Sequence, residues 1–204
     1  MSFARDVDLL RYEPGIFDDV RWAGQRTIAA TTGQVTGGAL LANGIDDAFM
    51  DGGYVVLLGG VAYEMIGKSG QAVMVSLVRW EEGSTWHEDV EFDEINVEGF
   101  TFRPQLEAVH GQLMRSVGVE PGDAESVVVN GAAMVEMEAF GALYTIYAGA
   151  SMLSAELGAY ERKAMLYRDR LRSARSRAVV ELDLDGDGAV DARRRLGVMQ
   201  LVRG

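Results

Sequence analysis

Residues 54–80 read YVVLLGGVAYEMIGKSGQAVMVSLVRW, and this stretch decides the fold. Two apolar runs, 54–58 and 61–66, are separated only by Gly59-Gly60. A two-residue Gly-Gly link between such runs is typical of a tight β-hairpin. A second turn signal at 67–70 precedes another apolar run, 72–80. We therefore predict three consecutive antiparallel strands.

The β texture extends outward from this meander, from about residue 25 to residue 103. Further strands are expected near 33–42 and 90–102, where short apolar runs alternate with glycine. These strands predict a small β-barrel or sandwich module over 16–103. The mixed charged and apolar residues before it, 1–15, are closed by Pro14-Gly15 and are expected to form an N-terminal arm.

The pattern becomes helical at Pro104, a residue suited to the first turn of a helix. Apolar side chains and His110 follow on one helical face, and Gly118 is placed to end this helix. Two more helices are expected at about 132–157 and 159–179. The predicted class is α+β: the β module, a helical-bundle module over 104–180, and an acidic loop with a C-terminal arm over 181–204.

Composition narrows the function classes. The chain has no cysteine, which excludes disulfides, thiolate metal sites and a cysteine nucleophile, and fits assembly in a reducing cytoplasm. The first residues are charged, so no signal peptide is expected. Residues 139–155 lack charged side chains but include Gly, Tyr, Ser and Thr. They favour a helix buried in protein over a membrane span.

Charge is unevenly distributed along the chain. Residues 1–158 hold 8 Lys and Arg against 24 Asp and Glu, a net of −16, whereas 159–204 hold 11 against 7, a net of +4. Such asymmetry indicates an interaction segment, for nucleic acid or for the acidic half of a neighbouring copy. Because aromatic residues are not interleaved with the basic ones, a solvated face or acidic neighbours are favoured over phosphate.

The most specific local motif is the run of aspartates and glycines at 183–191. Asp183, Asp185, Asp187 and Asp191 occupy positions 1, 3, 5 and 9 of a calcium loop, and Gly188 occupies position 6. Position 12, where a bidentate acid belongs, is Arg194. The loop is therefore either a Ca²⁺ site or a structural turn whose carboxylates accept backbone amides or pair with arginines; we predict the structural turn.

No other motif predicts catalysis. Gly67-Lys68-Ser69 lacks the first glycine of a phosphate-binding loop, since Ala62 stands there, and a hairpin is the expected context. His87 is expected in a loop, and His110 is expected to be a satisfied core or interface histidine. Neither histidine has a Ser or Asp partner by spacing, so we do not expect an enzyme.

The arrangement resembles the head–tail adaptor (connector, head-completion) proteins of tailed phages and related prophages. The resemblance covers about half of the chain, mainly 100–190, and its motifs are loose. Three stretches carry it: 5–17 with Trp22, 102–123 through His110, and 160–188.

That resemblance implies a structural virion protein of the neck, assembled in the host cytoplasm. It implies a homo-oligomeric ring of about twelve copies that joins the portal protein to a stopper or tail-completion protein. DNA would pass nearby without sequence-specific binding, and no membrane would be involved. The β module over 16–103 is an addition to the minimal adaptor of that family, which is helical only. The alternative is a calcium-dependent binding module built on the aspartate loop.

Overall fold

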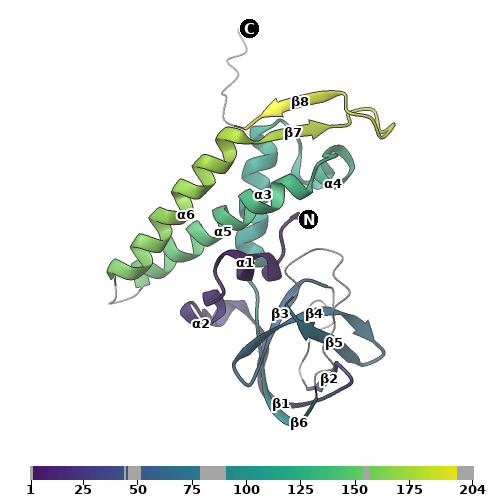
Figure 1. Ribbon diagram of the computed structural model, residues 1–204, viewed down its shortest axis with the longest axis vertical. Coiled ribbons are helices and arrows are strands. Elements are labelled where there is room, and N and C mark those ends of the chain that lie inside the picture. Colours follow the sequence, from purple (N-terminus) through teal and green to yellow (C-terminus); the bar gives the residue numbers. More distant parts are fainter. Residues whose placement is uncertain (1, 44, 46–51, 79–90, 154–156, 197–204) are drawn as a thin grey trace. The chain divides into compact units, whose positions relative to one another are not determined.

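The computed structural model describes residues 2–43, 45, 52–78, 91–153 and 157–196. The chain forms two compact units, the barrel unit (Arg5–Phe102) and the helical unit (Met1–Ala4 with Arg103–Gly204). The predicted α+β class is confirmed, with a β-barrel preceding the long helices of the helical unit (Figure 1). The barrel unit is thus an insertion between the first four residues of the helical unit and the rest of it.

Six antiparallel strands close the barrel in the order β1-β2-β5-β4-β3-β6, with β6 returning to β1. Each of the six strands therefore has a neighbour on both sides, as in closed barrels generally. The strands are β1 (Arg26–Thr36), β2 (Ala39–Ala42), β3 (Tyr54–Leu58), β4 (Val61–Ser69), β5 (Ala72–Leu77) and β6 (Phe92–Phe100).

The Gly-Gly link forms the predicted hairpin. Gly59 and Gly60 have φ of 58° and 88°, and Leu58 pairs with Val61 across the turn. Positive φ at both central residues is the requirement of a type I′ turn, which glycine meets without strain. The next turn lies later than the sequence indicates, because Gly67 to Ser69 still belong to β4. This is a hairpin rather than a phosphate-binding loop.

The barrel core is apolar and fully enclosed. Alternate residues of β3, namely Tyr54, Val56 and Leu58, pack inward with side chains from the other strands. Val55 and Leu57 point to the opposite face, yet they are buried as well. Helix α1 (Asp6–Tyr12) contacts β3, and the amide of Val7 donates to the carbonyl of Gly53 at 3.1 Å. The outer face of β3 is therefore covered.

The first 15 residues differ from the expected arm. They contain α1, and α2 (Ile16–Asp19) follows directly. Val7, Leu9 and Leu10 are buried, and the carboxylate of Asp6 accepts hydrogen bonds from Thr101 Oγ1 at 2.6 Å and from the Phe102 amide at 2.8 Å. The charged residues that suggested an arm include this buried aspartate, which fixes the helix to the end of the barrel.

Three helices form the frame of the helical unit. They are α3 (Arg103–Ser116), α5 (Ala132–Leu153) and α6 (Leu157–Arg177), and α5 packs against both of the others (Figure 1). Tyr147 on α5 is fully buried and stacks with Tyr160 and Tyr167 on α6, at centroid distances of 5.9 and 6.0 Å. Among the described residues, no helix is long and apolar enough to span a membrane.

Gly118 ends α3 as expected. Its φ is +70°, its amide donates to Arg115 O, and the amide of Val119 donates to Met114 O at 3.0 Å. This pair of bonds is a Schellman motif, which satisfies carbonyls at the end of the helix. A 3₁₀ turn (Pro121–Asp123) and the short α4 (Ala124–Val127) lead on to α5.

The C-terminal part also differs from the expected arm. Strands β7 (Val179–Leu182) and β8 (Ala192–Arg195) form an antiparallel hairpin, in which Val180 and Leu182 are buried. Asn130 clamps β7 by donating to Val179 O and accepting from the Glu181 amide, both at 2.9 Å. Buried side chains and these bonds hold the hairpin on the helical unit. The rest of the expected arm lies, after Leu196, outside the described residues.

Candidate functional site

The aspartate loop connects β7 and β8, so the hairpin ladder fixes both of its ends. Leu182 pairs with Ala192, and the Asp191 amide donates to Leu182 O at 2.8 Å. The chain reverses here with the help of Gly186 and Gly188, whose φ values are 79° and 85°. These two conformations strain any residue with a Cβ, which explains the glycine spacing of the motif.

The carboxylates of the loop accept hydrogen bonds from its own backbone. Asp183 accepts from the amides of Gly186 and Gly188 at 2.7 and 2.8 Å. Asp185 accepts from the Asp187 amide at 3.2 Å, and Asp187 accepts from the Ala189 amide at 2.7 Å. These contacts are the Asx turns expected of such a loop, and they agree with the predicted amide contacts.

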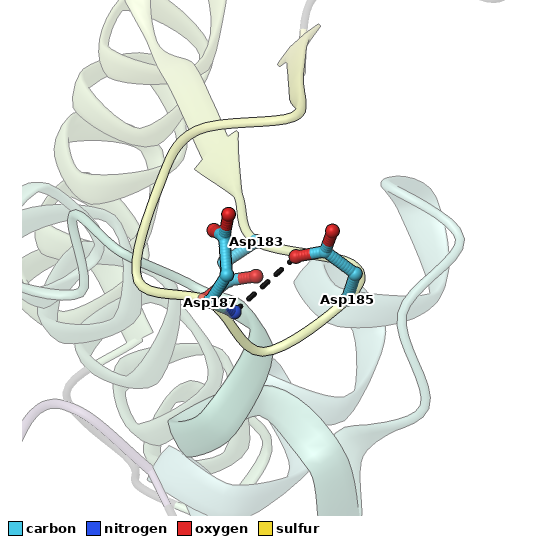
Figure 2. Close-up of side chains that lie close together, drawn as sticks. All are labelled: Asp183, Asp185 and Asp187. Atoms are coloured by element: carbon cyan, nitrogen blue, oxygen red, sulfur yellow. Dashed lines mark hydrogen bonds between the residues drawn. The ribbon is translucent and has the colours of Figure 1, made fainter.

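Three of the four predicted ligands come together. Carboxylate oxygens of Asp183, Asp185 and Asp187 lie within 4.8 Å of one another (Figure 2). Asp183 is 7% exposed, and the other two are exposed. The Gly188 amide, aided by other loop amides and opposed by burial, lowers the pKa of Asp183 below its usual value. Asp183 is therefore an anion at neutral pH.

The fourth predicted ligand, Asp191, is directed elsewhere. Its Oδ2 accepts from the Leu184 amide at 2.7 Å and from the Asp185 amide at 3.3 Å. At position 12, the Arg194 guanidinium donates to Val117 O at the end of α3. Within the described residues no ion pair joins these aspartates to the arginines of β8. Arg193 pairs instead with Glu181, at 2.9 Å.

This loop can offer a hard cation three carboxylates from alternate positions, which is the chemistry that Ca²⁺ prefers. It lacks the bidentate acid, and the cationic Arg194 side chain follows on β8. Each of the three carboxylates already accepts at least one amide hydrogen bond. The residues therefore fit a weak cation site or a purely structural turn, and they do not form a complete calcium cage.

His110 has a partner that spacing did not reveal. Its Nδ1 lies 2.7 Å from Glu138 Oε1, and its Nε2 lies 3.3 Å from Pro121 O. Both side chains of the pair are buried. The Ala4 amide donates to Glu138 Oε2 at 2.8 Å, and the Phe3 ring meets the imidazole edge-on at 5.3 Å. The prediction of a satisfied core histidine is confirmed, whereas His87 lies outside the described residues.

Burial raises the pKa of Glu138 above its ordinary value, although hydrogen bonds from Ala4 and His110 oppose the shift. The sequence contains a signal for this residue. Met134, Met137, Glu138 and Gly141 follow one another at helical spacing, so the acid falls on the buried face of α5. An acid on such a face needs a buried partner, and His110 is the histidine of the neighbouring helix.

Both helices of the α5–α6 hairpin expose apolar side chains. Met152 and Leu153, at the end of α5, are 86% and 78% exposed, and Met165 and Leu166 on α6 are each 47% exposed. Exposed apolar side chains of this size, adjacent at the end of α5, are typical of a protein-binding surface.

Comparison with known proteins identifies no relative: no family model, no curated protein and no solved structure matches this chain.

Proposed function

We propose that this chain is a structural neck protein of a tailed-phage particle, of the head–tail adaptor kind. It joins the portal to the tail, or to the next neck protein, as one copy of an oligomeric ring. Its work is binding rather than catalysis, and its contacts are with other proteins while DNA passes nearby.

The proposal is supported by the way two of the three resembling stretches fold; the third, 5–17 with Trp22, lies in the barrel unit. Residues 102–123 and 160–188 are separate in the sequence, yet all but Phe102 fall within the helical unit. There they supply α3 and most of α6, which pack against α5, and β7 with most of the aspartate loop. An adaptor needs such a self-supporting helical body, because each copy must present fixed faces to several neighbours at once.

The observation that carries the proposal is the exposed apolar end of α5, Met152 and Leu153. Burying a side chain of this kind contributes about 1.5–3 kcal/mol. Leaving two of them in water is unfavourable unless a partner covers them. A protein whose role is to be joined to others on an assembly pathway has that partner.

The test replaces both residues with aspartate, Met152→Asp with Leu153→Asp, in the genome that encodes the chain. The variant should fold with an unchanged melting temperature, because these side chains make little contact within the chain. Particle assembly should stop at DNA-filled heads without tails, counted by negative-stain microscopy. Ala133→Asp, an exposed position at the start of α5, is the matched control and should give normal particles. Normal numbers of tailed particles from the double variant would contradict the proposal.

A second candidate function, cation-dependent binding, is favoured by one observation, the three carboxylates within 4.8 Å. Calorimetric titration with Ca²⁺ tests it. We expect no dissociation constant below roughly 10 μM, the sensor range, and tighter binding after Arg194→Glu. Arg194 also donates a hydrogen bond to Val117 O, so its replacement can change stability. A melting curve of that variant must therefore accompany the titration. Sensor-range binding by the unmodified chain would make the loop a calcium site.

A further inference from the structure

We infer that the basic surface of α6 docks onto an acidic surface of β6 in a second copy of this chain. The inference rests on the proposed structural role and names the partner of one of its faces. Its basis is that one chain carries two exposed, oppositely charged surfaces whose charges are mostly not neutralised within the described residues.

The basic surface consists of exposed arginines on α6. The helix holds seven Lys and Arg against two Asp and Glu, a net of +5. Among the described residues Arg172 and Arg177 form no ion pair, and Arg168 pairs only with its neighbour Asp169, at 3.5 Å. The exposed members are Arg162, Arg168, Arg170, Arg172 and Arg177.

Part of this surface is held in place before any partner binds. The Arg170 guanidinium lies over the rings of Phe140 and Tyr167, 5.8 and 5.4 Å from their centroids. All but one of the basic residues of α6 are arginines rather than lysines. A planar guanidinium binds a carboxylate through two parallel hydrogen bonds, so an ordered arginine surface suits a partner rich in carboxylates.

The acidic surface lies on the barrel. Its described residues, 91–102, contain four Asp and Glu and no Lys or Arg. Glu91, Asp93 and Glu94, at the start of β6, are exposed. Within the described part of the chain, Asp93 and Glu94 form no ion pair. Strands β1 and β3 pair with β6 on its two sides, so these carboxylates sit on a fixed frame.

Two observations favour a protein partner over nucleic acid. Met165 and Leu166 are half-exposed among the arginines, and apolar side chains gain nothing from phosphate. The chain as a whole carries −12, which repels a polyanion at low salt, where arginine–phosphate attraction is strongest. A second copy brings carboxylates for the arginines and apolar surface for Met165 and Leu166.

Docking α6 of one copy onto β6 of the next is a heterologous contact. Each copy then keeps one free α6 surface and one free β6 surface, so the contact repeats. It closes into a ring when the rotation between copies permits, and otherwise gives open chains. The second copy is thus a partner that can build the ring of the proposed function.

The experiment measures self-association of the full chain by sedimentation velocity at about 50 mM and about 500 mM salt, where screening differs several-fold. We expect association at low salt that weakens at high salt. Arg168→Glu with Arg172→Glu should weaken it about tenfold or more, and so should Asp93→Lys with Glu94→Lys. The chain that combines all four changes should recover association, since each surface then carries the opposite sign.

A control pair reverses two exposed basic residues elsewhere, Arg115→Glu and Lys68→Glu, and should leave association unchanged. A chain that is monomeric at every salt concentration would overturn the inference. So would self-association that is unchanged in either charge-reversal variant, or that does not return in the chain combining all four changes. Binding of a DNA duplex by a monomer, lost with the α6 reversal, would assign the surface to nucleic acid instead.

The outcome is separable from that of the proposed function. Failure of the charge reversals, together with tailless particles from the Met152 and Leu153 variant, would overturn the α6–β6 contact and leave the adaptor role standing. Charge-dependent association, together with normal particles from the Met152 and Leu153 variant, would support the α6–β6 contact and overturn the adaptor role.

Discussion

Truncation of Glu138 to alanine gives the sharpest test of how the helical unit is held together. The change removes the hydrogen-bond partner of two buried groups, the Ala4 amide and Nδ1 of His110. Each buried polar group left without a partner costs about 1–3 kcal/mol. The variant also no longer has to bury a carboxylate, a cost that the raised pKa of Glu138 reports. We expect a net loss of about 3 kcal/mol.

The assay is urea unfolding followed by far-ultraviolet circular dichroism, which reports mainly on the helices. Because the chain has two units, the helical transition is fitted separately rather than as one step. Glu136→Ala is the matched control, since this exposed glutamate lies two residues away on the same helix. It should change stability by no more than about 0.5 kcal/mol. A loss below about 1 kcal/mol in Glu138→Ala would refute the role given to the buried pair.

Three further predictions concern stability. The pKa of Glu138 is higher in the folded chain than in the unfolded chain, so the folded chain binds the proton of this carboxyl more tightly. The resulting stabilisation of the folded state is fully present below the ordinary pKa of glutamate, and it is lost as pH rises through the raised pKa of the folded chain. Urea midpoints between pH 4 and 8 should therefore fall for the wild-type chain relative to Glu138→Gln; a constant difference would refute this. Gly118→Ala should cost about 1–2 kcal/mol because φ is +70°, whereas Gly122→Ala, with open space for a Cβ, should cost less; equal losses would contradict the Schellman assignment. Tyr147→Ala, which empties a fully buried site, should cost about 3–5 kcal/mol in the same assay, and a small loss would mean that the site collapses.

The sequence predicted correctly those turns and helix ends that depend on the conformation of one or two glycines. Gly59-Gly60 specified a hairpin because only glycine adopts positive φ at both positions without strain. Gly118 specified the end of α3 for the same reason. Strand order was not predictable in this way. The pairing of β6 with both β1 and β3 closes the barrel, and it joins residues far apart in the sequence, where no spacing rule applies.

The terminal segments show the limits of reasoning from charge. The mixture of Asp, Arg and Glu with a few apolar residues at 1–15 predicts an N-terminal arm. Asp6 is nevertheless buried, and its hydrogen bonds come from Thr101 and Phe102, about a hundred residues later. The His110–Glu138 pair has the same character. A polar residue at a buried helical position indicates that a partner exists, but tertiary packing decides which one.

The aspartate loop was predictable in its turn chemistry and not in its electrostatics. Carboxylates that accept amides at short spacing follow from the Asp and Gly pattern. The partner of Arg194 does not, because the guanidinium reaches Val117 O at the end of a helix formed about eighty residues earlier. Arginines next to aspartates in sequence therefore do not imply ion pairs between them.

The adaptor role is tested most directly by a reconstruction, from electron micrographs, of the neck of purified particles whose genome encodes this chain. The map should contain a ring of copies between the portal and the next neck or tail protein. In each copy the end of α5, at Met152 and Leu153, should be covered by a neighbouring protein. A neck made entirely of other proteins, with this chain absent from the purified particles, would contradict the proposal.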